Sequence, residues 1–174
     1  MRIISGSHKG KRIFINENLS VRPTTDRAKE GIFNIIDNRY YFNEKNVLDL
    51  FSGTGNISFE FGSRGVEEIT SVDSNNNCIK CIEETNKVLK YNLSTIKLDA
   101  LDYLEKCDNQ FNFIFADPPY NYDKYQDIIQ IIKEKNLVKK NGLLIIEHDK
   151  NNSFDDENLE IRKYGTTYFS IFSF

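Results

Sequence analysis

The sequence predicts an α/β protein whose mostly parallel sheet is covered by helices on both faces, a doubly wound arrangement. Short apolar runs typical of buried strands alternate along the chain with longer stretches that have the apolar period of a helix. Several apolar runs end at an aspartate or lead into glycines. Ligands of such sheets bind at the carboxyl ends of the strands, so these residues are expected to surround one site. They are Asp49, Gly53, Gly55, Asp73, Asp99 and Asp117.

The length of 174 residues suits a single domain over residues 1–174, in which residues 1–22 form a basic N-terminal arm. A hydrophobic content of 39% and a charged content of 28% favour a globular chain over a disordered one. No apolar run approaches the roughly 20 residues of a membrane helix, and no signal peptide precedes the fold. We therefore expect a cytoplasmic protein that does not enter a membrane.

The three cysteines are an odd number, which agrees with that compartment. Cys78 and Cys81 have the spacing of half a metal site, but no second pair of Cys or His at metal spacing accompanies them. His8 and His148 lie far apart in the sequence. We therefore expect no metal, and predict that the two cysteines face inward from a helix.

The net charge is −3, but it is unevenly distributed. Residues 1–30 carry seven Lys or Arg and three acids, a net of +4, so the remainder carries −7. Residues 2–5 and 12–15 are predicted to form two short strands joined by a basic, glycine-containing turn. This hairpin-like arm could bind the phosphate backbone of RNA or DNA, or it could be a solvated basic turn. The residues expected to contact phosphate are His8, Lys9, Lys11 and Arg12.

A helix is predicted to run from Thr24 or Thr25, either of which can cap it, to about residue 38. Its apolar face consists of Ala28, Ile32, Phe33, Ile35 and Ile36. Arg22, Asp26 and Arg27 crowd its start. Arginines are mildly unfavourable at the positive end of a helix dipole, so capping does not explain them. We expect this charged cluster to face a ligand.

A glycine loop, Asp49-Leu50-Phe51-Ser52-Gly53-Thr54-Gly55, joins a predicted strand over residues 46–50 to a helix over residues 56–61. Glycines at a helix N-terminus let backbone N–H groups approach a ligand closely. A dinucleotide-binding loop also has a third glycine, and Ser58 occupies that position. No Lys-Ser/Thr pair follows, which excludes a phosphate-binding P-loop. The loop therefore favours a nucleoside ligand without a pyrophosphate group.

The next strands and helices are predicted at residues 69–72, 75–90, 93–98 and 101–106. Asp73 lies about 20 residues past the glycine loop, the spacing of an acid that accepts hydrogen bonds from ribose hydroxyls. Asp99 could accept a hydrogen bond from an adenine amino group, with Ala100 leaving room for the ring. Asp73 and Asp99 could each instead cap the helix that follows. Ser74 could cap the first of these two helices equally well.

The strand predicted at residues 111–115 leads into Asp117-Pro118-Pro119-Tyr120. Each proline fixes φ and lacks an N–H group, and Pro119 restrains Pro118 towards an extended conformation. The result is a stiff turn that presents a carboxylate, backbone carbonyls and an aromatic ring together. This combination suits the exocyclic amino group of a planar base, because the acceptors hold its hydrogens while the ring stacks on the base. An ordinary strand-ending turn is the alternative.

The remaining elements continue the alternation of helices and strands. A helix is predicted at residues 122–134 and a strand at residues 142–147. Residues 159–164 and 168–172, on either side of Gly165, are predicted to pair as an antiparallel hairpin at an edge of the sheet.

With these motifs the sequence resembles class I S-adenosylmethionine-dependent methyltransferases, and more closely the RsmD-type family of 16S ribosomal RNA guanine-N2 methyltransferases. The resemblance covers nearly the whole chain. It is carried by Arg2-Ile3-Ile4-Ser5-Gly6, Arg22-Pro23-Thr24-Thr25-Asp26-Arg27, the glycine loop and the Asp117–Tyr120 turn. The second segment discriminates best, because the glycine loop and the turn occur in many methyltransferases. The resemblance implies a Rossmann-like seven-stranded sheet whose last strand is antiparallel.

The resemblance also implies roles for individual residues. The cofactor, S-adenosyl-L-methionine, would lie against Asp49, Phe51, Gly53, Gly55, Asn56, Asp73, Ser74, Asp99 and Ala100. The target amino group and its base would be held by Asp117, Pro118, Pro119 and Tyr120. The RNA would contact His8, Lys9, Lys11, Arg12, Arg22, Thr24, Asp26 and Arg27. The implied partner is ribosomal RNA or a small-subunit assembly intermediate, and no obligate protein partner is evident.

Other functions are compatible with parts of this pattern. An adenine-N6 methyltransferase of DNA or RNA would use the same Asp-Pro-Pro-Tyr turn, because the turn suits any exocyclic amine. A nucleotide-binding module without catalysis, or an NAD-linked oxidoreductase, would use the glycine loop and leave the turn unexplained. Ser58 at the third glycine position counts against NAD.

Overall fold

The computed structural model of the protein describes residues 1–14 and 24–174. Arg22 and the last residue of the strand predicted at 12–15 lie outside the described residues. Within the described part, no helix has both the length and the apolar character needed to cross a lipid bilayer.

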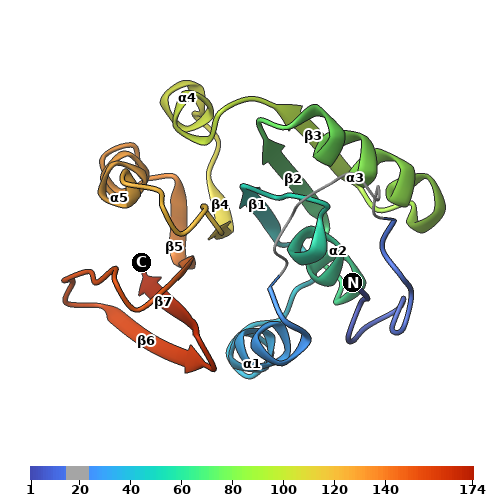
Figure 1. The fold of residues 1–174 in the computed structure, drawn as a ribbon, viewed down its shortest axis with the longest axis horizontal. Helices are drawn as coiled ribbons and strands as arrows, with labels where there is room; N and C mark the ends of the chain where they lie inside the picture. The colour runs from blue at the N-terminus through green and yellow to red at the C-terminus, as the bar shows by residue number, and fades with distance from the viewer. Residues whose placement is uncertain (15–23) are drawn as a thin grey trace.

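Among the described residues, seven strands form one sheet (Figure 1). In sheet order they are β3 (Leu93–Lys97), β2 (Glu68–Asp73), β1 (Asn46–Leu50), β4 (Phe111–Ala116), β5 (Val138–His148), β7 (Thr167–Ser173) and β6 (Leu159–Tyr164). The first five of these are parallel, and β7 lies antiparallel between β5 and β6. The predicted doubly wound sheet with an antiparallel last strand is confirmed.

Helices cover both faces of this sheet. They are α1 (Asp26–Asp37), α2 (Asn56–Ser63), α3 (Asn76–Leu89), α4 (Ala100–Lys106) and α5 (Tyr125–Glu134). One buried cluster joins α4 and α5 to the sheet through residues such as Ile114, and another joins α1 and α2 to the opposite face through neighbours such as Phe113. Figure 1 shows these two pairs of helices on opposite sides of the strands. Successive residues of β4 therefore pack into different layers, as the period of a strand requires.

Strand order reverses beside β1, whose neighbours are β2 and β4. In a doubly wound sheet this switch point opens a crevice at the carboxyl ends of the strands, because the connecting helices leave it on opposite faces. Asp49 and Leu50 end β1, and Asp117 follows β4 directly beside them, with its amide nitrogen 3.4 Å from the Leu50 carbonyl. The fold thus brings the glycine loop and the proline turn to the same crevice.

The N-terminal arm differs from the predicted pair of strands. In place of a strand ladder, its two halves share an isolated bridge between Arg2 and Arg12. Beside this bridge the Ile3 amide donates to the Lys11 carbonyl at 2.9 Å, whereas the amides of Ile4 and Ser5 donate to the carboxylate of Glu60 on α2, at 2.8 and 3.1 Å. The arm is therefore tied to α2.

Two other boundaries also differ from the sequence prediction. Helix α5 begins at Tyr125 rather than at residue 122, because the Tyr122 amide closes a turn onto the Pro119 carbonyl at 2.8 Å. Strand β5 begins at Val138, where it pairs with Phe111 before a shift in register. The prediction for Cys78 and Cys81 is confirmed, since both are buried free thiols on α3.

Candidate active site

A cavity of about 520 Å³ lies at the carboxyl ends of the central strands. Most residues predicted to bind a cofactor or a target base line it together. They are Asp49, Phe51, Gly53, Asn56, Asp73, Ser74, Asp99, Ala100, Asp117, Pro118, Pro119 and Tyr120. Gly55 does not line it. This volume falls in the usual range for small-molecule sites, roughly 300–1,000 Å³.

The glycine loop has a backbone that most side chains would strain. Gly55, the N-cap of α2, has φ +83°, and a Cβ there would lie 2.7 Å from the ring of Phe59. Phe51 also adopts a positive φ, +57°, although it is not a glycine, and its ring packs edge-to-face on Tyr122 at 5.2 Å. Backbone strain of this kind persists where the surrounding structure fixes it, often at functional sites. Phe51 thereby connects the glycine loop to the turn after β4.

Substitution of Gly55 with alanine is expected to destabilise the protein more than substitution of Gly165 with alanine. Both glycines have positive φ, but only Gly55 would place a Cβ against neighbouring side chains. Gly165→Ala should cost about 1 kcal/mol for the left-handed backbone alone. Gly55→Ala should cost at least about 1 kcal/mol more, because overpacking adds to that strain. Urea unfolding of the two variants measures the difference, and equal losses would contradict it.

Asp49 is a buried acid at the end of β1. Its Oδ2 accepts hydrogen bonds from the Ser58 amide at 3.0 Å and from the Ser58 hydroxyl, whose Oγ lies 2.7 Å from the Ser71 Oγ. Burial raises the pKa of Asp49 to about 7, although the bonds from Ser58 act in the opposite direction. Ser58, which occupies the position of the third glycine in a dinucleotide-binding loop, therefore holds the Asp49 carboxyl group in place.

The raised pKa of Asp49 predicts that the stability of the ligand-free protein depends on pH. The carboxyl group stays protonated in the folded state up to about pH 7, whereas in the unfolded state it ionises near its ordinary value. The stability it contributes is thus present at low pH and is lost as the pH rises to about 7. Between pH 5 and 8 the wild type should lose about 2–3 kcal/mol relative to Asp49→Asn. Denaturant unfolding at each pH checks this, and a constant difference would contradict it.

Asp73, at the end of β2, holds the glycine loop in place. Its carboxylate accepts hydrogen bonds from the Gly53 amide at 2.8 Å and the Asn75 amide at 2.7 Å. Burial raises its pKa. The predicted alternative, in which Asp73 or Ser74 caps the following helix, is wrong, because the side chain of Asn75 caps α3. Asp73 thus stands at the cavity with its carboxylate oriented by two backbone amides.

Asp99 caps a helix and also lines the cavity. It is the N-cap of α4 and accepts a hydrogen bond from the Leu101 amide at 2.9 Å, so the capping prediction is confirmed. Its neighbour Ala100 is buried, and both residues line the cavity. Because a carboxylate has more than one acceptor position, capping leaves Asp99 able to accept from a ligand as well.

The residues predicted to bind RNA are spread over several places. Thr24 is buried and lines the cavity, whereas Asp26 forms an exposed ion pair with Arg2 at 3.0 Å. His8 is anchored to the protein, since its Nδ1 lies 2.6 Å from the Tyr91 hydroxyl and its amide donates to the Ser63 Oγ at 2.9 Å. The side chains that remain exposed are Lys9, Lys11, Arg12 and Arg27.

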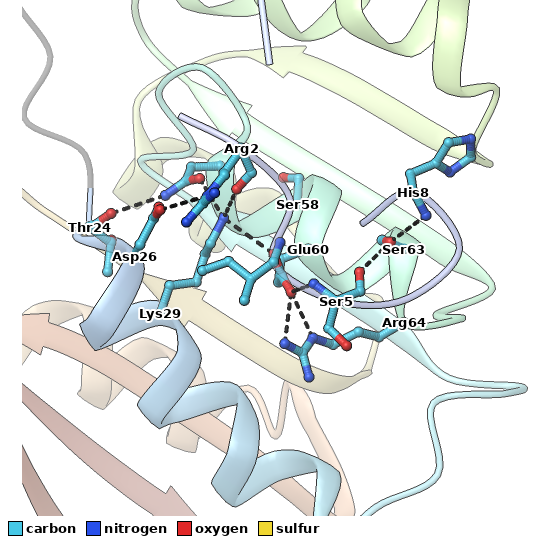
Figure 2. A network of polar contacts seen from close by, with 12 residues as sticks. Arg2, Ser5, His8, Thr24, Asp26, Lys29, Ser58, Glu60, Ser63 and Arg64 are labelled. Atoms are coloured by element: carbon cyan, nitrogen blue, oxygen red, sulfur yellow. Dashed lines mark hydrogen bonds and ion pairs between the residues drawn. The ribbon is translucent and has the colours of Figure 1, made fainter. Parts of the chain in front are cut away.

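The sequence analysis missed a buried ion pair between Lys29 and Glu60, 3.2 Å apart and with no exposed side-chain surface. The Lys29 ammonium also donates to the Arg2 carbonyl and to Asn56 Oδ1, each at 2.8 Å. Burial lowers the pKa of Lys29, and the nearby Glu60 opposes this shift. Figure 2 shows this network between α1, α2 and the arm. Because Asn56 lines the cavity, the network joins the arm to the cavity wall.

Glu147 is a second missed residue. It lies near the end of β5, is only 4% exposed and lines the cavity, where one carboxylate oxygen accepts a hydrogen bond from the Thr24 hydroxyl at 2.7 Å. The acid that ends the predicted strand 142–147 was the available signal, since it repeats the pattern of Asp49, Asp73 and Asp117.

Comparison with known proteins agrees with this geometry. The family model described as Conserved hypothetical protein 95 matches residues 1–173. Ribosomal RNA small subunit methyltransferase D of Haemophilus influenzae is 30% identical over 173 residues, which cover 96% of this chain and 89% of that protein. A hypothetical protein of Thermus thermophilus has a solved structure with a TM-score of 0.88 at 23% identity, over 99% of this chain and 98% of that one.

A more distant likeness is to SMU.776, whose structure is described as complexed with SAH. Its TM-score is 0.64 at 17% identity, and the match covers 84% of this chain and 49% of that one. At these identities the two solved structures show the fold alone.

The switch-point cavity, the glycine loop and the proline turn on a seven-stranded sheet, together with the 30% identical relative named as a methyltransferase, define a Rossmann-like fold of the class I methyltransferase type. More specifically, the chain belongs to the family described as Conserved hypothetical protein 95, in agreement with the RsmD-type resemblance of its motifs.

Proposed function

We propose that this protein uses S-adenosylmethionine to methylate the exocyclic N2 amino group of a guanine in small-subunit (16S) ribosomal RNA. One observation carries the proposal: the glycine loop, Asp73 and the Asp-Pro-Pro-Tyr turn line the same cavity. A methyl donor and a target amine can therefore meet there. The family relative from Haemophilus influenzae is named as a methyltransferase of small-subunit ribosomal RNA, which supports this choice of substrate.

The cavity suits S-adenosylmethionine in size and chemistry. Asp73 would hold the ribose hydroxyls, Asp99 and Ala100 the adenine, and the strained loop around Phe51 and Gly53 the methionine part. Asp49, buried beneath this loop, supports its shape through Ser58. When bound, the cofactor supplies a methyl group on a positively charged sulfur. The relative SMU.776, which is described as complexed with SAH, has the same fold.

The proline turn would position the target base. The guanine amino group is a poor nucleophile, because its lone pair is delocalised into the ring. The Asp117 carboxylate and the Pro118 carbonyl would accept its two hydrogens and direct the lone pair at the methyl carbon, while Tyr120 stacks on the base. Bound S-adenosylmethionine would supply the methyl group and leave as S-adenosylhomocysteine, and the proton that the amino nitrogen loses would pass to the Asp117 carboxylate, which accepts its hydrogen bond. Positioning of this kind can contribute about 7–11 kcal/mol.

The RNA would approach over the arm and the start of α1. Lys9, Lys11, Arg12 and Arg27 are exposed there and can neutralise phosphates. Arg22 would contribute too, although it lies outside the described residues. His8 would act differently, by holding the arm against Tyr91. Such phosphate contacts would position the RNA without selecting the base.

Mass spectrometry of nucleosides from ribosomal RNA, prepared from cells with and without the gene, tests the proposal. We expect N2-methylguanosine to be lost from small-subunit RNA without the gene and restored when purified protein and S-adenosylmethionine are added. Parallel reactions with naked RNA, assembly intermediates and duplex DNA identify the substrate. N6-methyladenosine as the product would favour the adenine alternative. Calorimetric binding of NAD in preference to S-adenosylhomocysteine would exclude a methyltransferase.

A further inference from the structure

Glu147 stands beside the proposed target-binding acid. Strands β4 and β5 are parallel, and their register pairs Phe115 with Ile145 and Ala116 with Ile146. The next residues along the two strands are Asp117 and Glu147, and both line the cavity. Neighbouring strands lie about 4.8 Å apart, so continuation of this register by one residue would place the two acids side by side at the end of the sheet. None of the roles proposed above uses Glu147.

The Glu147 carboxylate is held by a buried chain of hydrogen bonds. Thr24 donates from its hydroxyl to Glu147 Oε2 at 2.7 Å, and its own carbonyl accepts from Asn56 Nδ2 at 3.3 Å. Lys29 in turn donates to Asn56 Oδ1 at 2.8 Å. These partners are all buried. Such support fixes the orientation of a carboxylate, as recognition of a base edge requires.

Two adjacent carboxylates can distinguish the hydrogen-bonding edge of guanine from that of adenine. Guanine presents the hydrogen of N1 next to the two hydrogens of its 2-amino group, a row of donors. Adenine presents its 6-amino group next to N1, which is an acceptor. A carboxylate facing N1 would therefore accept a hydrogen bond from guanine and meet only a lone pair in adenine. Leaving buried polar groups unpaired in this way is an effective means of rejecting the wrong substrate.

We propose that Glu147 is a specificity-determining residue that accepts a hydrogen bond from N1–H of the target guanine while Asp117 holds the 2-amino group. This inference rests on the proposed function and deepens it. A carboxylate has about four acceptor positions, so Glu147 can accept from the Thr24 hydroxyl and from the base together. The same arrangement disfavours the adenine alternative, which shares the proline turn.

The test removes the N1 hydrogen of the target base. The target nucleotide is first mapped by mass spectrometry of ribonuclease fragments of the same RNA, and RNA is then assembled with guanosine or 2-aminopurine riboside at that position. 2-Aminopurine keeps the 2-amino group but has neither the hydrogen on N1 nor the 6-oxo group of guanine. The wild type should methylate guanosine at least about 30-fold faster in kcat/KM. In Glu147→Gln the ratio should fall to within about three-fold, because the amide can donate to N1 of 2-aminopurine.

Controls separate recognition from folding. Glu147→Gln should bind S-adenosylhomocysteine within about three-fold of the wild type, and Glu160→Gln, a change in an acid on the distant strand β6, should keep the wild-type ratio. Thr24→Val, which removes one hydrogen bond to the Glu147 carboxylate, should give an intermediate ratio. A wild type that accepts both bases equally, or a Glu147→Gln ratio equal to that of the wild type, would overturn the inference. No transfer to guanosine by the wild type would overturn the proposed function itself.

Discussion

Replacement of Asp117 with alanine is expected to lower kcat for methyl transfer by about 10³-fold or more. The same change should leave the dissociation constant for S-adenosylhomocysteine within about three-fold of the wild type. The reason is that Asp117 would hold the target amino group, whereas the cofactor would lie against the loops after β1, β2 and β3. Single-turnover methylation assays and calorimetry measure the two quantities separately.

Asp123 provides a matched control for this experiment. It is an exposed acid in the segment that follows the turn, and it does not line the cavity. Asp123→Ala should therefore change kcat by less than about two-fold. If Asp117→Ala lost turnover and cofactor affinity equally, Asp117 would be a cofactor-binding residue, and the proposed arrangement of the target base would be wrong.

The second large expected effect is a loss of stability when the ion pair between Lys29 and Glu60 is broken. Glu60→Gln leaves the Lys29 ammonium buried without its counter-charge, and it also weakens the acceptor for Arg64 and for the amides of Ile4 and Ser5. The free energy of unfolding should fall by about 3–5 kcal/mol. Lys29→Met should cost about half as much, because Glu60 keeps its bond to Arg64. Urea unfolding followed by circular dichroism measures these losses.

An exposed ion pair serves as the comparison. Arg39 and Glu160 are 2.7 Å apart on the protein surface, with partly exposed side chains. Glu160→Gln should change the free energy of unfolding by less than about 1 kcal/mol, since water screens such pairs. A loss from Glu60→Gln as small as this would show that the Lys29 network does not stabilise the fold.

The sequence predicted the sheet well, for a reason visible in its strands. Runs such as Phe111–Ala116 are apolar at every position but one, as expected of a strand buried on both faces of a parallel sheet, and each such run ends at an acid or a glycine. The rule that ligands bind at the carboxyl ends then placed Asp49, Asp73 and Asp117 together before any contact was known. The number of strands and the antiparallel direction of the last one came from the family resemblance.

What the sequence did not show depends on tertiary packing. Lys29 contributed to the sequence prediction only as one of the seven basic residues of residues 1–30, because a lysine on a helix is usually solvated. It is buried because Glu60 on α2 neutralises it, and every residue of α2 is buried. The predicted phosphate contact of His8 stays a prediction, and the contact of its ring with Tyr91 could not be expected from the sequence. Periodicity within one helix cannot reveal a partner on another.

The place of β7 in the sheet affects how the chain folds as it is synthesised. β7 follows β6 in the chain but lies between β5 and β6, so β5, which carries Glu147, has no neighbour on that side until residues 167–173 are available. A nascent chain in which only the residues up to β6 have left the ribosome would expose the unpaired apolar edge of β5. Such an edge can pair with strands of other chains. A truncation before residue 167 should therefore aggregate rather than yield a smaller working enzyme.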